Sequence, residues 1–88
     1  MTLHLGNGHT VDSKNVVAVM DIEKASTSKI TREYLASAGK AGRVITCSYE
    51  LPKSFVVSLD SDLTERVYIL GIAAETVRKR IRDINNIR

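Results

Sequence analysis

The sequence predicts one α+β domain over residues 1–88, with a small, mostly antiparallel sheet of five to six strands and two helices in the order β-β-β-α-β-β-β-α. Two observations support this prediction. Short runs rich in Val and Ile are separated by turns that contain Gly, Asn or Pro, which is typical of strands. Two other segments place their apolar residues at helical spacing instead.

The first 22 residues predict three strands. Leu3 and Leu5 alternate with polar residues, and the Gly-Asn-Gly turn at residues 6–8 indicates a hairpin between residues 1–5 and 9–12. The run NVVAVMDI at residues 15–22 is apolar at consecutive positions, so we expect a strand with both faces covered.

The middle of the chain changes to helical periodicity. Ser26, Thr27 and Ser28 can each cap a helix over residues 29–38, whose apolar stripe is Ile30, Tyr34 and Ala38. Gly39 and Gly42 are expected to end this helix. Three more strands are predicted in RVITCSY (43–49), SFVVSL (54–59) and ERVYIL (65–70), with Pro52 just outside the second of them. A last helix begins near residue 73, with the stripe Val77, Ile81 and Ile84.

The apolar content of the strands predicts self-association. The runs VVAV and FVV place apolar side chains on both faces of their strands, so both faces favour burial. Two short helices can cover one face of a sheet of this size more easily than both faces. A chain of this length buries only roughly 60–65% of its unfolded surface on folding, which leaves a thin stability margin. We therefore expect a homo-oligomer, in which a second subunit covers the remaining face or edge.

Charge is distributed unevenly along the chain. Residues 1–74 carry eight Lys/Arg and eight Asp/Glu, whereas residues 75–88 carry five Lys/Arg and two Asp/Glu, so the whole net charge of +3 lies in the last fourteen residues. Such a basic segment favours a polyanionic partner.

Patterns typical of catalytic, metal or cofactor sites are missing from the sequence. His4 and His9 have no Cys pair or patterned carboxylates beside them, and Cys47 in an apolar strand is expected to be a buried, unreactive thiol. LGNGHT lacks the third glycine and the Lys-Ser/Thr of a phosphate-binding loop, and DSD at residues 60–62 lacks the spacing of a calcium loop. We expect no enzymatic activity, no metal, no cofactor and no small-molecule substrate.

The chain is expected in the cytoplasm. Its single cysteine excludes an intrachain disulfide and fits a reducing compartment, and the N-terminus does not resemble a signal peptide. No apolar run approaches the ~20 residues that span a bilayer, so no membrane association is expected.

The basic C-terminal helix has two interpretations. It is either a solvated amphipathic helix whose cations suit the helix dipole, or a surface that contacts phosphates. The aromatic residues all lie in apolar patterns, so aromatic side chains on which single-stranded bases could stack are missing, which favours duplex DNA. Both interpretations of the helix stay open at this point.

The order of motifs resembles the RemA/RemB family of small bacterial regulators over residues 2–81. The likeness consists of LHLGNGHTVDSKNVVAVMDI, a Ser/Thr-initiated helix, LPKSFVVSLDSD and VYILGIAAETVRKRI, and the PKS and ETVRKR segments look closer to the RemB branch. This resemblance implies a DNA-binding regulator of extracellular-matrix (biofilm) genes. It also implies a ring-shaped homo-oligomer that binds DNA along its outside, as in the RemA branch.

The chain departs from the RemA pattern at the implied DNA contacts. Leu51-Pro52 and Asn15 stand where that branch has an Arg-Arg pair and a further Arg. Neighbouring cations offer a weaker version of the same surface, or the contact has moved to the last helix. The predicted DNA-binding residues are therefore Lys14, Asn15, Arg43, Lys53, Arg78, Lys79 and Arg82.

The function predicted from the sequence is a DNA-binding transcriptional regulator of matrix genes, which binds duplex DNA through basic contacts repeated on a homo-oligomeric ring. The alternative is an oligomeric scaffold or protein-interaction module of the same fold that has lost direct DNA binding. In that case the basic helix would contact an acidic protein surface or the neighbouring subunit.

Overall fold

The computed structural model describes residues 1–85 and shows an α+β fold built on two sheets. The chain runs through β1 (Thr2–Gly6), β2 (His9–Asp12), the 3-10 turn η1 (Ser13–Asn15), β3 (Val16–Asp21), α1 (Ile22–Ala25), α2 (Lys29–Lys40), β4 (Val44–Thr46), β5 (Ser54–Leu59), β6 (Glu65–Leu70) and α3 (Ala74–Asn85). Apart from the short helix α1, which the sequence analysis did not predict, this is the expected order of elements. No helix among residues 1–85 is long and apolar enough to cross a membrane.

The strands form a pair and a four-stranded sheet, not one sheet of five or six. β1 and β2 pair only with each other, and the larger sheet has the order β3-β5-β6-β4. The turn between β1 and β2 has positive φ at Gly6, Asn7 and Gly8, the conformation that the GNG motif allows. β4 runs parallel to β6, whereas the β3–β5 and β5–β6 pairs are antiparallel.

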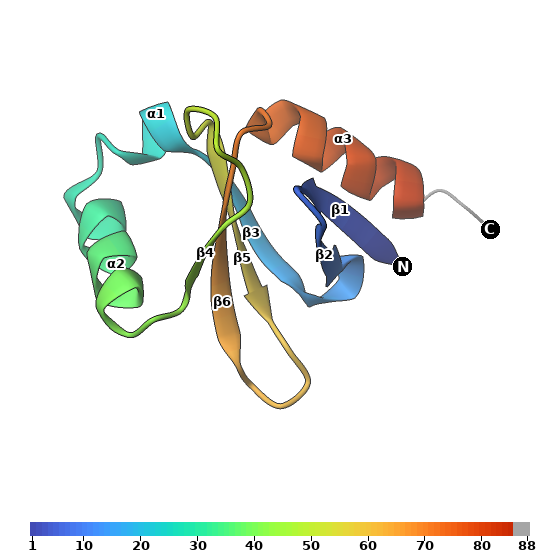
Figure 1. The fold of residues 1–88 in the computed structure, drawn as a ribbon, viewed down its shortest axis with the longest axis horizontal. Helices are drawn as coiled ribbons and strands as arrows, with labels where there is room; N and C mark the ends of the chain where they lie inside the picture. Colours follow the sequence, from blue (N-terminus) through green and yellow to red (C-terminus); the bar gives the residue numbers. More distant parts are fainter. Residues whose placement is uncertain (86–88) are drawn as a thin grey trace.

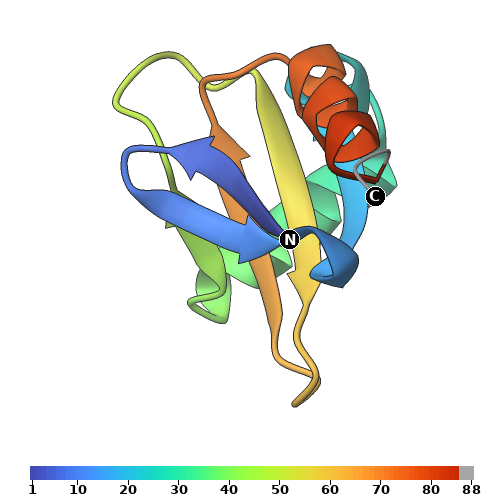
Figure 2. The same ribbon diagram turned by 90° about the vertical axis from the view of Figure 1, so that its right-hand side faces the viewer.

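The larger sheet is covered on both faces by the chain itself (Figures 1 and 2). On one face, Leu3, Leu5 and Val11 of the hairpin and Val77 of α3 pack with buried residues such as Val56. On the other face α1 and α2 lie over a second cluster; its buried members are Ala25, Ala38, Phe55, Val57 and Val67. Alternate residues of β5 therefore enter two different cores.

This coverage corrects the packing argument for an oligomer. The sequence analysis expected a second subunit to cover the second face or the edge of the sheet. The β1–β2 hairpin covers that face within one chain, and Ser54 to Ser58 are all at most 8% exposed, whereas a contact at the edge stays a prediction. The hairpin was counted there as part of the main sheet, so its covering role was missed. The coverage of this face therefore gives no support to the predicted self-association.

The helices follow their predicted boundaries closely. Ser28 caps α2, with its side chain accepting a hydrogen bond from the N–H of Thr31, and Gly42 at φ +72° follows the helix end. The stripe of α3 packs as predicted, but in α2 it is Tyr34, Leu35 and Ala38 that pack on the sheet. Ile30 is 79% exposed, contrary to the prediction.

Candidate nucleic-acid interface

The connection from β4 to β5, residues 47–53, holds Lys53 at a fixed place. The Lys53 N–H donates to the carbonyl of Leu70 in β6 at 2.8 Å, and its carbonyl accepts from the N–H of Ile22 in α1 at 3.1 Å. The Lys53 side chain is exposed and has no ion-pair partner among residues 1–85. The backbone is thus anchored on both sides while the cation faces solvent.

Two apolar side chains of the same connection are exposed. Tyr49 is 96% exposed and Leu51 is 82% exposed. The sequence analysis placed Tyr49 in an apolar strand, but β4 ends at Thr46, so Tyr49 lies beyond the sheet. The signal that could have found it is the Glu-Leu-Pro turn that follows directly. An exposed aromatic ring therefore accompanies Lys53 in this loop.

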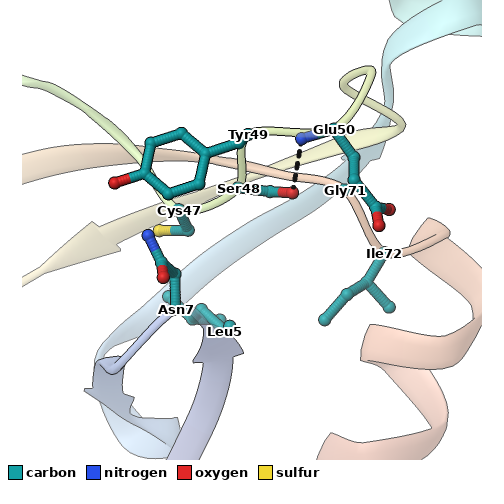
Figure 3. A pocket seen from close by; sticks show the side chains of 9 residues that line it. Leu5, Asn7, Cys47, Ser48, Tyr49, Glu50, Gly71 and Ile72 are labelled. Atoms are coloured by element: carbon teal, nitrogen blue, oxygen red, sulfur yellow. Dashed lines mark hydrogen bonds between the residues drawn. The ribbon is translucent and has the colours of Figure 1, made fainter.

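A hollow of about 400 Å³ lies between this loop, the β1–β2 turn and the start of α3 (Figure 3). Cys47 and Asn7 line one part of it, and Glu50 and Ile72 line another. A Cβ atom at Gly71 would lie 2.6 Å from the Ser48 hydroxyl oxygen, so glycine is needed for this close approach. Figure 3 shows the Glu50 carboxylate and the Cys47 sulfur on opposite sides of the hollow, and no group of three or more metal-ligating side chains occurs among the described residues.

Cys47 is expected to react slowly in the folded protein. Burial raises the pKa of its thiol to about 11 from an ordinary value of 9.0, so almost no reactive thiolate exists at pH 8. Alkylation at pH 8 should be at least ~100-fold slower in native buffer than in denaturant, because about two pKa units separate the two states. Because the raised pKa belongs to the folded state, stability should fall as the pH rises from about 9 to 11. Equal alkylation rates in the two conditions would contradict the buried position.

Lys14 and Asn15 lie in η1, directly before β3. The Asp12 carboxylate accepts a hydrogen bond from the Lys14 N–H at 3.1 Å, which is the first cause of the lowered pKa of Asp12. The Lys14 ammonium is 79% exposed and lies 3.7 Å from the same carboxylate. An ion pair this exposed is weak, so Lys14 stays available to a partner, whereas Asn15 is half-buried.

Lys14 and Lys53 lie at opposite ends of the β3–β5 pair. Val16, which follows η1, pairs with Ser58, whereas Ser54, which follows Lys53, pairs with Asp21. At about 3.4 Å per residue, the two cations are separated by roughly 15–20 Å along the strands. Within one chain they do not form a single patch.

Arg43 already has a partner. Its guanidinium pairs with the carboxylate of Glu65, which also accepts a hydrogen bond from the Tyr34 hydroxyl at 2.8 Å. The guanidinium lies 6.0 Å from the centre of the Tyr34 ring. Burial and the adjacent Glu65 raise the pKa of Tyr34. This group ties α2 and the start of β4 to β6, so the charge of Arg43 is largely neutralised.

The cations of α3 divide into two kinds. Arg78 donates to the carbonyl of Val19 at 3.0 Å and to the carboxylate of Glu75 at 3.3 Å, so it holds α3 against β3. Lys79 and Arg82 are exposed. Arg78 is therefore engaged within the chain, whereas both interpretations of the helix stay open for Lys79 and Arg82. Arg88, which contributed to the basic tail, lies outside the described residues.

A family model for "RemA-like: Extracellular matrix regulatory protein A-like" proteins matches residues 2–81, nearly the whole chain. The chain belongs to the RemA-like family. The family resemblance predicted from the order of motifs is thereby confirmed, with the same boundaries. Lys53 and the neighbouring loop lie within the matched region.

One curated relative of this RemA-like protein is "Extracellular matrix regulatory protein B" from Bacillus subtilis (strain 168). The two sequences are 29% identical over 80 residues, which cover 91% of this chain and 89% of the relative. Both comparisons place the protein among extracellular matrix regulatory proteins.

Proposed function

We propose that this RemA-like protein is a cytoplasmic, non-enzymatic regulator of extracellular-matrix genes that binds duplex DNA through basic contacts repeated around a homo-oligomeric ring. The observation that carries the proposal is Lys53, an exposed cation whose backbone is anchored to both β6 and α1. It lies next to Leu51-Pro52, where the resemblance places the paired arginines of the RemA branch. The anchored backbone removes the cost of ordering the main chain when this lysine contacts a phosphate, so only the side chain has to be ordered.

Repetition compensates for the few free cations of each chain. Lys14 and Lys53 lie at separate ends of the sheet, and Arg43 and Arg78 are engaged within the chain. One exposed lysine gives a weak contact, but copies on one assembly raise the effective concentration of each for a duplex that spans them. The proposal therefore implies backbone binding with low sequence specificity.

DNA binding is expected to depend steeply on salt and on Lys53. The logarithm of the affinity should fall by roughly 0.9 per neutralised phosphate for each unit of log salt. Lys53→Gln should weaken binding of a duplex and lower the salt slope. Lys40→Gln is the matched control, because Lys40 is an exposed lysine in the last turn of α2, away from the proposed contact. Mobility shift across a salt series measures both quantities.

Three results would contradict the DNA proposal. One is the absence of a shift with any duplex at low salt. The second is an equal effect of Lys53→Gln and Lys40→Gln, which would assign binding to net charge. The third is tighter binding of a single-stranded oligonucleotide than of the duplex, which would assign the contact to stacking on the exposed Tyr49.

A second function, an oligomeric scaffold without DNA binding, is favoured by a different observation. The loop that carries Lys53 also exposes Tyr49 and Leu51, which is the composition of a protein-contact surface. Assembly without any mobility shift would support this scaffold.

A further inference from the structure

An apolar groove runs between α2 and the sheet, along β3. Two adjoining hollows of about 290 and 440 Å³ form it, and Met20 and Thr31 line both. Ala18, Phe55 and Val57 line the first hollow from the sheet side. Ile30, the α2 residue expected in the core, lines the same hollow while 79% exposed. Figure 1 shows α2 beside the sheet. The groove is lined by residues of α2, β3 and β5 on this side.

The end of the groove next to α1 is basic. Lys24 and Arg78 line it, together with Asp21. Asp21 already accepts a hydrogen bond from the Lys24 N–H at 3.2 Å, as the cap of α1. The Lys24 side chain has no ion-pair partner in the described part of the chain, whereas Arg78 pairs with Glu75, so Lys24 is the cation of this end that is open to a partner.

The loop between β5 and β6, residues 60–64, exposes an apolar and an acidic side chain, which complement the apolar lining and the basic end of the groove. Leu63 is 78% exposed and has φ +66°, a left-handed conformation that costs a leucine about 1–2 kcal/mol. The Leu63 N–H donates to the Asp60 carbonyl at 2.9 Å, and the Asp60 N–H donates to the Thr64 carbonyl at 3.0 Å. These hydrogen bonds hold an unfavourable conformation that places an apolar side chain in solvent, next to the exposed Asp62. Backbone strain of this kind concentrates at functional contacts.

The tip and the basic end of the groove lie at opposite ends of one sheet. Asp21, at the basic end, pairs with Ser54 at the start of β5, whereas the tip follows the end of β5. Figure 1 shows the β5–β6 loop at one end of the sheet and α1 at the other. A chain therefore cannot bring its own tip to the basic end of its groove, but a second copy can.

We propose that the tip of one copy, residues 60–64, docks in the groove of the next, with Leu63 on the apolar lining and Asp62 toward Lys24. The occupant is assigned to a second copy because the tip carries an exposed apolar side chain that suits the apolar lining and a carboxylate that suits the end where two cations, Lys24 and Arg78, outnumber the one carboxylate. Such a contact joins two different surfaces, so it propagates head to tail and closes into a ring when the rotation permits. It rests on the self-association in the proposed function and does not depend on DNA binding.

Mixing two defective variants tests this contact. Leu63→Asn removes the apolar side chain of the tip and keeps a residue that tolerates positive φ. Ile30→Glu places a charge in the groove at an exposed position, where folding should be unaffected. Each variant alone should run as a 9.7 kDa monomer in size-exclusion chromatography with light scattering, whereas the wild type assembles. An equimolar mixture should give a species of twice that mass, because one intact tip and one intact groove remain.

A charge exchange and a control complete the experiment. Asp62→Lys and Lys24→Glu should each lower the assembled mass, and the double variant should restore part of it. Val17→Ala, at an exposed apolar residue of β3 that lines neither hollow, should leave the mass unchanged. Circular dichroism at the same concentration establishes that each variant is folded.

Several outcomes would overturn the proposed contact. They are an assembled Leu63→Asn variant, a folded pair of variants that stays monomeric on mixing, loss of assembly in Val17→Ala alone, and a monomeric wild type. The last would also remove the ring from the proposed function. Assembly as expected, without a DNA mobility shift, would remove only the DNA contact and leave this interface in place.

Discussion

Leu3→Ala is expected to lower the free energy of unfolding by about 3 kcal/mol. Leu3 is 1% exposed and packs in the cluster that joins the hairpin to β5, β6 and α3. The substitution removes apolar contacts and leaves a cavity that a two-stranded hairpin cannot easily close. Since domains have only about 5–15 kcal/mol of stability, the loss is a large fraction of the total. Urea denaturation followed by circular dichroism measures it.

Leu51→Ala is the matched control for this substitution. It makes the same chemical change at a side chain that is 82% exposed, so a change within about 0.5 kcal/mol is expected. Both variants should be compared at a concentration where the protein is monomeric, because assembly adds stability by mass action. A loss below about 1 kcal/mol for Leu3→Ala would mean that the hairpin does not close this face of the sheet.

Two buried serines of β5 are expected to respond in opposite directions. Ser54 and Ser58 are both 0% exposed and point to the same face. The Ser54 hydroxyl donates to the carbonyl of Ile72 at 2.6 Å, whereas the Ser58 hydroxyl oxygen has no hydrogen-bond partner in the described residues. Ser54→Ala should therefore cost about 1–2 kcal/mol, and Ser58→Ala should stabilise the domain by up to about 1 kcal/mol.

Each serine variant serves as the control for the other, because the substitution, the strand and the exposure are the same. Thermal unfolding of the two variants and the wild type gives the order of stabilities. Destabilisation of equal size in both would show that packing volume, and not the hydrogen bond to Ile72, governs this face.

The strands and the two long helices could be predicted because their signals are local. The Gly-Asn-Gly turn, the Ser28 cap and the stripe of α3 each depend on residues within a few positions of one another. Self-association through uncovered strand faces was inferred from the same local patterns and was not supported. Local periodicity shows that a strand is buried, but not which element covers it.

Features set by distant residues could not be predicted. The parallel pairing of β4 with β6 depends on the path of the chain through α1 and α2. Arg43 was predicted to be a free cation, but Glu65 lies 22 residues away along the chain and beside it in space. Six of the seven predicted contact residues were chosen for their positive charge, and Asn15 for its position in the sequence. The fold distributes the seven over different parts of its surface. The roles of these residues in binding DNA remain predictions.

The division of β5 between two cores also fixes its register. Ser54, Val56 and Ser58 face the hairpin and α3, whereas Phe55 and Val57 face the α2 side. A slip by one residue would turn the phenylalanine toward the hairpin and both serines toward α2. One core would then hold a side chain that is too large, and the other would hold side chains that are too small. The same slip would move Lys53 at one end of the strand and the residue 60–64 tip at the other. The placement of both serines on one face of β5 and of Phe55 on the other therefore sets the positions of the proposed DNA contact and the proposed subunit contact together.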